Sequence, residues 1–110
     1  MESEEVLVRR TIRELKKLKE YIQQGPPDVI IGKAGVTEGV LREIERHLDQ
    51  KGIIKVKMLR TTLKTEGKDR FTIAEEIAKK LNALLLEVRG RTLVLYREPK
   101  KKSKTLKNQK

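Results

Sequence analysis

The chain has 110 residues, which is enough for one small domain with short extensions. Lysine and arginine number 27 against 16 aspartates and glutamates, so the formal net charge is +11 at pH 7. No segment has the roughly 20 consecutive apolar residues that a membrane helix needs, and no signal-peptide pattern follows the start. We therefore expect a soluble, cytoplasmic protein that makes no membrane contact.

The residue types that are missing narrow the chemistry further. Without cysteine there is no disulfide, zinc ribbon, thiol nucleophile or cysteine-bound iron–sulfur cluster. His47 is the only histidine, and glutamates that are neighbours in sequence point to different sides of their helices. No acid–base pair or metal cluster can be assembled from these groups. We therefore predict a non-enzymatic protein without metal or cofactor. Its positive charge predicts that it binds a polyanion.

Aromatic residues are scarce. Tyr21, Phe71 and Tyr96 are the only ones, and tryptophan is absent. RNA-recognition-motif domains stack bases on paired sheet aromatics, and this chain has little to supply such a surface. Phe71 and Tyr96 are predicted to lie partly in the core. Affinity for nucleic acid should therefore rest on phosphate contacts, with little readout of bases.

The first predicted element is an amphipathic helix from about Glu4 to Gln23, which Gly25-Pro26-Pro27 ends. Apolar residues recur along it at spacings of three and four, at Val8, Ile12, Leu15, Leu18 and Ile22. The opposite face is basic and includes Arg9, Arg13, Lys16 and Lys17. A face of this kind can bind a polyanion or can simply be solvated, and both interpretations stay open.

The middle of the chain alternates strand and helix signals. Val29–Ile31 is predicted as a short buried strand, and Thr37 as the N-cap of a helix that ends near Lys51-Gly52. Ile53 to Arg60 alternates as a strand. Residues 61–70 are polar, and we predict a loop there with no part in function.

A capping box at Thr72 and Glu75 predicts the start of the next helix. Two strands follow, Leu84–Val88 and Thr92–Tyr96, in a hairpin around Arg89-Gly90-Arg91. Residues 99–110 carry six lysines and no acid, which predicts a disordered basic tail. Residues 1–98 are then the single domain.

The element order α-β-α-β-α-β-β predicts an α+β fold. Two β-α-β passages indicate parallel neighbouring strands, and the last hairpin adds an antiparallel pair. We therefore expect a mixed four-stranded sheet with helices packed on one side.

The segment VIIGKAGVTEGV, residues 29–40, carries the clearest functional signal. Its glycine–x–x–glycine turn, Gly32–Gly35, leads from a strand into the start of a helix and holds Lys33. Glycines let a phosphate approach the backbone, N–H groups at the helix start donate to it, and the helix dipole favours its charge. K-homology domains clamp nucleic-acid backbone with such a loop. The alternative is a simple turn whose glycines only satisfy unusual backbone angles.

Two segments, IIGKAGVTEGVLREIERHLDQKGIIKVKML and IAEEIAKKLNALLLEVRGRTLVLYR, resemble the CRM domain (chloroplast RNA splicing and ribosome maturation). The resemblance is to the stand-alone YhbY type and its archaeal relatives, and it runs from about Arg9 to Glu98. It implies a fold like the C-terminal domain of bacterial translation initiation factor three, with strand order 1-2-4-3 and the last strand antiparallel. It also implies RNA binding, and stand-alone bacterial members associate with precursors of the large ribosomal subunit. Val36 stands where the family more usually has leucine, and the first helix matches only loosely.

The candidate RNA contacts lie on the loop and the helix after it, on the first helix, on the second strand and at the hairpin. They are Gly32, Lys33, Ala34, Gly35, Thr37, Arg9, Arg13, Lys16, Lys17, Lys55, Lys57, Arg89 and Arg91. The strand lysines would otherwise keep one sheet face soluble, and the hairpin arginines would otherwise decorate an exposed turn.

The sequence thus predicts an RNA-binding module for structured RNA, with ribosomal RNA in large-subunit assembly as the expected target. Two alternatives stay open. A small chromatin-type protein of the Alba kind would bind DNA with a similar fold and charge. A protein–protein adaptor would carry its basic surface only for solubility. The sequence does not predict an oligomeric state.

Overall fold

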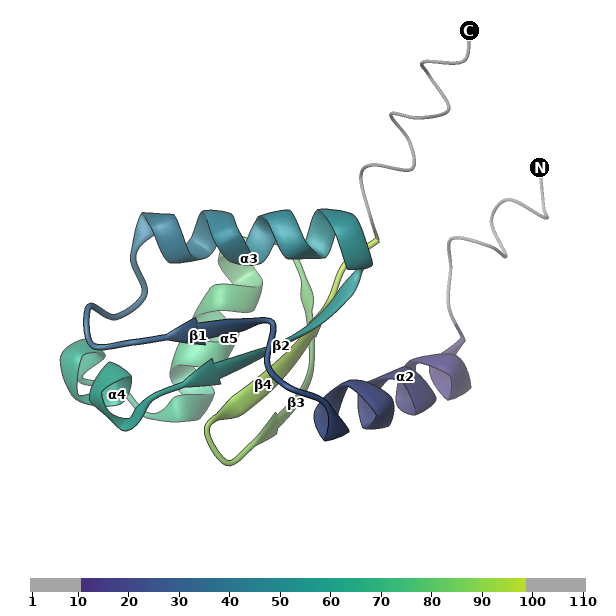
Figure 1. The fold of residues 1–110 in the computed structure, drawn as a ribbon, viewed down its shortest axis with the longest axis horizontal. Helices are drawn as coiled ribbons and strands as arrows, with labels where there is room; N and C mark the ends of the chain where they lie inside the picture. Colours follow the sequence, from purple (N-terminus) through teal and green to yellow (C-terminus); the bar gives the residue numbers. More distant parts are fainter. Residues whose placement is uncertain (1–10, 99–110) are drawn as a thin grey trace, which may run out of the picture.

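The computed structural model describes residues 11–98 (Figure 1). Its elements in chain order are α2 (Ile12–Gln24), β1 (Val29–Ile31), α3 (Glu38–Lys51), β2 (Ile53–Met58), α4 (Arg60–Glu66), α5 (Arg70–Lys80), β3 (Leu84–Arg89) and β4 (Thr92–Tyr96). The candidate residue Arg9 and the predicted tail at 99–110 lie outside the described residues. No helix within residues 11–98 is long and apolar enough to cross a membrane.

The four strands form one mixed sheet in the order β1-β2-β4-β3, which confirms the order 1-2-4-3. β1 and β2 are parallel neighbours, while β4 is antiparallel to both β2 and β3. The expectation of two parallel neighbour pairs is therefore wrong for the second β-α-β passage. The final hairpin places β4 between β2 and β3, so these two parallel strands do not touch.

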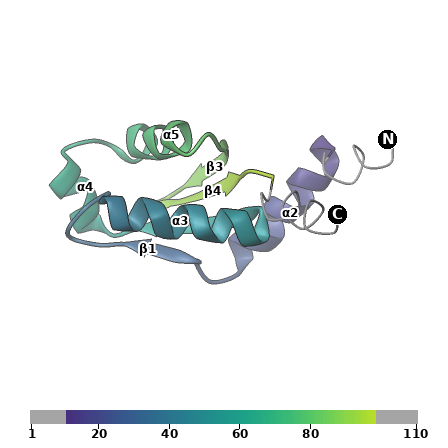
Figure 2. The ribbon, with the colours of Figure 1, turned by 90° about the horizontal axis from the view of Figure 1, so that it is seen from above.

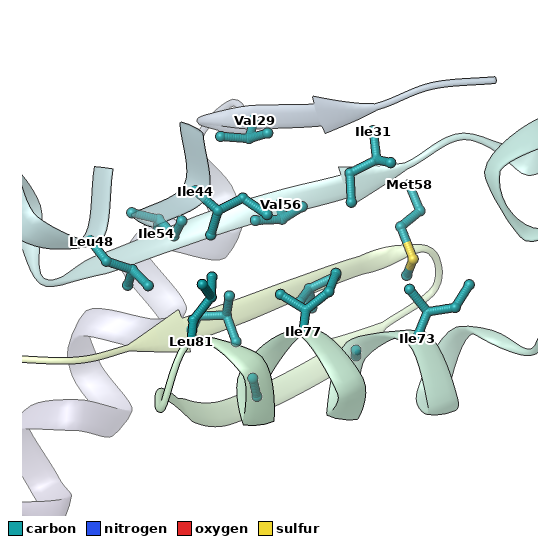
Figure 3. Packing of buried hydrophobic residues seen from close by; sticks show 14 residues of the cluster. Val29, Ile31, Ile44, Leu48, Ile54, Val56, Met58, Ile73, Ile77 and Leu81 are labelled. Carbon is teal, nitrogen blue, oxygen red and sulfur yellow. The ribbon is translucent and has the colours of Figure 1, made fainter. Parts of the chain in front are cut away.

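The main core lies between one sheet face and the helices α3 and α5 (Figures 2 and 3). Ile44 from α3 and Ile77 from α5 are almost completely buried over Ile54, Val56 and the matching face of β4. Burying a side chain of this size contributes about 1.5–3 kcal/mol. The alternation predicted for β2 is confirmed, because its even-numbered residues all point into this core.

The helix α2 lies on the opposite face of the sheet, so the expectation that helices cover one side only is wrong. Lys55 faces away from the core, and its ammonium donates to the carbonyl oxygens of Gln23 at 2.8 Å and Gly25 at 2.9 Å. Val94, the register partner of Lys55, is fully buried on this face. The carboxyl end of α2 is thus held against β2 and β4.

The helix α2 also begins later than predicted. Thr11 is its N-cap and has extended backbone, so a continuous helix from Glu4 is wrong at this residue. The Thr11 hydroxyl accepts from the Glu14 N–H, and the Glu14 carboxylate accepts from the Thr11 N–H, each at 3.1 Å. This reciprocal pair is a capping box, which stops the helix on its amino side.

The polar segment predicted as a loop at residues 61–70 contains the helix α4 and the start of α5. Thr62 is fully buried, and its hydroxyl lies 2.6 Å from the Ile31 carbonyl oxygen. A polar anchor of this kind leaves no apolar periodicity in the sequence, which is why the helix was not predicted. α5 is capped by Asp69 and not by Thr72, because the Asp69 carboxylate accepts from the Thr72 N–H at 2.8 Å. This hydrogen bond is the main reason that the pKa of Asp69 is lowered.

Candidate nucleic-acid interface

The loop Gly32–Gly35 joins the end of β1 to the N-cap of α3. The Gly35 N–H donates to the Gly32 carbonyl oxygen at 3.0 Å, which closes a tight turn. Thr37 caps α3 as predicted, since its hydroxyl accepts from the Val40 N–H at 3.2 Å. The side chains of Lys33 and Ala34 point to solvent at the tip of the turn.

The two glycines of the loop have different structural requirements. Gly35 has a φ of +86°, and a Cβ at this position would lie 2.5 Å from a carboxylate oxygen of Glu66. Both the backbone angle and the close neighbour demand glycine there. A Cβ at Gly32 would meet no described atom within 4 Å, and its φ is not positive. Turn geometry therefore explains Gly35 and leaves Gly32 unexplained.

The helix α4 holds the loop from behind. Its Thr62 hydroxyl lies 2.9 Å from the Gly32 carbonyl oxygen, and the Thr65 hydroxyl donates to the Lys33 carbonyl oxygen at 2.6 Å. The Glu66 carboxylate accepts from the Val36 N–H at 2.7 Å. The two hydroxyl contacts fix carbonyl oxygens of the loop, and the Glu66 contact fixes the N–H that follows Gly35. They were not predicted because they join residues about 30 positions apart.

The N–H groups of the loop are therefore divided between two tasks. Those of Gly35 and Val36 have acceptors inside the fold, so they are not free to donate to a phosphate. Within residues 11–98, the N–H groups of Lys33 and Ala34 meet no acceptor. These two groups and the Lys33 ammonium are what the loop presents to an anion.

Several candidate cations gather at the loop end of the sheet. The Leu59 N–H donates to the Ile31 carbonyl oxygen at 3.1 Å, and the Met58 N–H donates to that of Arg91 at 2.8 Å. The hairpin tip with Arg91 is thereby placed beside the carboxyl ends of β1 and β2. Lys57 is half-buried next to Met58, on the sheet face away from the core.

Two exposed cations at this end, Arg60 and Lys64 on α4, were missed. Arg60 was predicted to end the strand from Ile53, which instead ends at Met58, and Lys64 was predicted to lie in a loop without function. We call Lys33, Lys57, Arg60, Lys64 and Arg91 the loop-end cations. None of them has an ion-pair partner among the described residues. The signal that could have found α4 is Gly67, whose left-handed backbone ends the helix.

Other candidate residues are placed elsewhere or are occupied. Arg13, Lys16 and Lys17 are exposed on α2, which lies at the opposite end of the molecule from α4 (Figures 1 and 2). The Lys55 ammonium holds α2, as described above. Arg89 forms ion pairs with Glu87 at 2.6 Å and Glu20 at 3.4 Å. The hydrogen bond that Arg89 donates to the Glu87 carboxylate is the main reason that the pKa of Arg89 is raised.

A family model described as the CRS1 / YhbY (CRM) domain matches residues 11–97. The chain belongs to this family. The match covers every described element, including α4, and it agrees with the family resemblance noted in the sequence.

Relatives in three organisms illustrate the similarity. A "Probable RNA-binding protein" of Methanocaldococcus jannaschii is 39% identical over 71 residues, which are 64% of this chain and 51% of that protein. The chain thus spans about half the length of this relative. A "Probable RNA-binding protein" of Pseudomonas aeruginosa is 32% identical over 98 residues, which are 89% of this chain and 90% of that protein. The solution structure of a Staphylococcus aureus protein has a TM-score of 0.62 and 26% identity, covering 84% of this chain and 92% of that one.

Proposed function

We propose that this CRM-family chain is a cytoplasmic, non-enzymatic protein that binds structured RNA during assembly of the large ribosomal subunit. The names of its relatives support RNA as the partner. A net charge of +11 supports a polyanion. The observation that carries the proposal is the loop, whose carbonyl side is fixed to α4 while Gly32, two free N–H groups and Lys33 face outward.

In the proposed complex an RNA phosphate lies against the backbone between Gly32 and Ala34. It accepts hydrogen bonds from the N–H groups of Lys33 and Ala34, and the Lys33 ammonium adds a charge-assisted contact. The missing side chain at Gly32 lets the sugar–phosphate chain come close to the protein backbone. Gly35 and Thr37 keep the turn and the helix start in place, and neither needs to touch the RNA.

The loop-end cations extend this contact along the RNA backbone. Lys57 and Arg91 lie on the sheet side of the loop, while Arg60 and Lys64 lie on the α4 side. Arg13, Lys16 and Lys17 offer a second basic surface on α2, which a longer RNA would reach. We place Arg89 and Lys55 outside the interface because their charges are used within the fold. Residues 1–98 form the binding domain in this proposal, and the lysines of residues 99–110 add attraction without sequence preference.

The test replaces the tip of the loop. Lys33→Asp with Ala34→Asp keeps both glycines, so stability should change by no more than about 0.5 kcal/mol. Binding of a labelled fragment of large-subunit ribosomal RNA, measured by fluorescence anisotropy, should weaken by at least about tenfold. The double variant brings negative charge to the position of the phosphate and removes a positive one. If the folded variant binds RNA as tightly as the parent, the loop is a simple turn that does not contact the RNA.

The control must change charge equally at a distance from the loop. A change at Glu66 is unsuitable because its carboxylate holds Val36. Arg46→Asp with Gln50→Glu makes the same charge change on the exposed side of α3, and it should affect binding far less. Competition with duplex DNA separates this proposal from a chromatin-type protein, since only DNA binding of equal strength would favour the latter.

A further inference from the structure

An exposed aromatic ring lies at the start of α5, where the sequence predicted a partial core position. Phe71 is 50% exposed, whereas Ile73, two residues later, is buried in the core. The guanidinium carbon of Arg70 lies 4.6 Å from the centroid of the Phe71 ring. A flat cationic group and an aromatic ring therefore form a stacked pair at the surface.

This pair lies at the loop end of the molecule. Figure 3 shows Ile73 at the same end of the core as Ile31, the residue directly before Gly32, with Leu81 and Leu48 at the other end. Glu66, whose carboxylate holds Val36 beside the loop, precedes Arg70 by only four residues. The chain between them can span at most about 14 Å. The backbone of Arg70 therefore lies close to that of Glu66, the residue that contacts Val36 beside the loop.

Electrostatics connects the two places. Lys64 and Arg60 are exposed on α4, and no described residue forms an ion pair with either. They provide positive charge for a nucleic-acid backbone that runs from the loop toward α5. Two acidic groups nearby are engaged, since Asp69 caps α5 and Glu76 pairs with Lys68 at 2.8 Å. Glu75, one turn after Phe71 on α5, is exposed and forms no ion pair with any described residue, so one carboxylate lies beside the pair.

A GxxG loop fixes the backbone of about four nucleotides and leaves their bases free. Unpaired bases of the RNA next to the loop need a flat surface to stack on. Aromatic rings and arginine guanidinium groups usually provide such a surface. Such stacking tolerates every base, which suits a pair that offers no hydrogen-bond pattern for readout. Arg70 and Phe71 are the only described residues that combine an exposed ring with a stacked guanidinium.

We propose that Arg70 and Phe71 stack an unpaired nucleobase of the RNA strand whose backbone lies on the Gly32–Gly35 loop. The inference rests on the proposed function, because it assigns the loop an RNA ligand. It adds a preference that the loop alone does not give. The preferred ligand is a stem that continues into a short single strand, and a fully paired stem lacks the base that this pair holds.

The experiment uses the full chain and two labelled RNAs, a blunt stem and the same stem with four unpaired nucleotides. Phe71→Leu keeps an apolar side chain but removes the ring, and Phe71 is half exposed and is not part of the buried core cluster. Binding of the extended stem should weaken about 5- to 150-fold, the range for losing one stacked base. Binding of the blunt stem should change less than about twofold. Tyr21→Leu removes another exposed ring, on α2, and should leave the ratio of the two affinities unchanged.

A second variant gives a direct optical signal. The chain has no tryptophan, so Phe71→Trp places a single indole at the site. Its fluorescence should be quenched by the extended stem and not by the blunt one. If Phe71→Leu binds both RNAs as the parent does, or the indole ignores the extended stem at saturation, the stacking site is overturned.

The loop variant keeps the two proposals apart. Lys33→Asp with Ala34→Asp should weaken binding of both RNAs, whereas Phe71→Leu should weaken binding of the extended one only. Loss in the loop variant with no effect at Phe71 overturns the stacking site and leaves the proposed function standing. A parent protein that binds neither RNA overturns both.

Discussion

At the scale of single residues, the motif Gly32–Gly35 was visible in the sequence but the reason for each glycine was not. Gly35 is required by its backbone and by the carboxylate of Glu66, and that neighbour comes from a helix 30 residues away. No local pattern announces such a contact. The sequence therefore predicted where the loop lies and which side chain it exposes, and it could not predict which N–H groups remain available to a ligand.

The two glycines should respond in opposite ways to alanine. Gly35→Ala should lower the free energy of unfolding by about 1–3 kcal/mol, because the residue must keep a left-handed backbone against a close oxygen. Gly32→Ala should leave stability unchanged or raise it by about 0.4–1 kcal/mol, because its backbone suits alanine. RNA binding by Gly32→Ala should still weaken about fivefold or more, since the methyl group occupies the approach of the phosphate. Thermal denaturation measures the change in stability, and fluorescence anisotropy measures the change in RNA affinity. If Gly32→Ala binds RNA as tightly as the parent, the phosphate does not lie at this position.

At the scale of elements, apolar periodicity predicted those that are held by apolar packing. β1, α3 and β4 have the predicted extents within a residue, because their buried faces recur at the spacing of a strand or a helix. Apolar periodicity did not predict α4, because this helix is held by hydroxyl and carboxylate contacts to β1 and the loop. The placement of α2 on the second sheet face was also hidden, since Lys55 reads as a solvated lysine until its two carbonyl acceptors are known.

The lysines of β2 provide a matched test of this division between structure and binding. Lys55→Met removes the donor for two carbonyl oxygens at the end of α2 and should lower the free energy of unfolding by about 1–3 kcal/mol. Amide exchange should then rise in α2 more than in α3. RNA affinity should change less than about twofold after allowing for unfolded protein. Lys57→Met, two residues along the same strand, should weaken RNA binding and leave stability almost unchanged. Equal losses of RNA affinity in the two variants would show that Lys55 also contacts the RNA.

At the scale of the whole molecule, the positive charges fall into two classes, those that form contacts within the fold and those that do not. Several of the cations stabilise the fold itself, including Lys55, Lys51 beside Asp28 at 2.5 Å, and Arg97, which donates to Asp49 at 2.8 Å. Other cations have no ion-pair partner in the described part of the chain. Those at the loop end and on the outer side of α2 form two groups, while Arg46 on α3 and Lys79 and Lys80 at the end of α5 lie elsewhere. A net charge of +11 therefore overstates the number of phosphates that one short RNA can neutralise.

This organisation predicts the salt dependence of binding. A short single-stranded RNA that contacts only the loop end faces five unpaired cations. Each neutralised phosphate of a single strand contributes about −0.7 to the slope of log K against log salt concentration. The slope should lie near −3 to −4. Arg91→Ser should make it shallower by about 0.7, because one contact is lost. Arg89→Ser, in the same hairpin, should leave the slope unchanged, because this guanidinium is already paired with Glu87 and Glu20.

The slopes of the parent and the two arginine variants are measured by anisotropy titrations at salt concentrations from about 50 to about 300 mM. A flat response in the parent would contradict phosphate contacts as the basis of affinity, and equal slopes for the two arginine variants would contradict the division between free and paired cations.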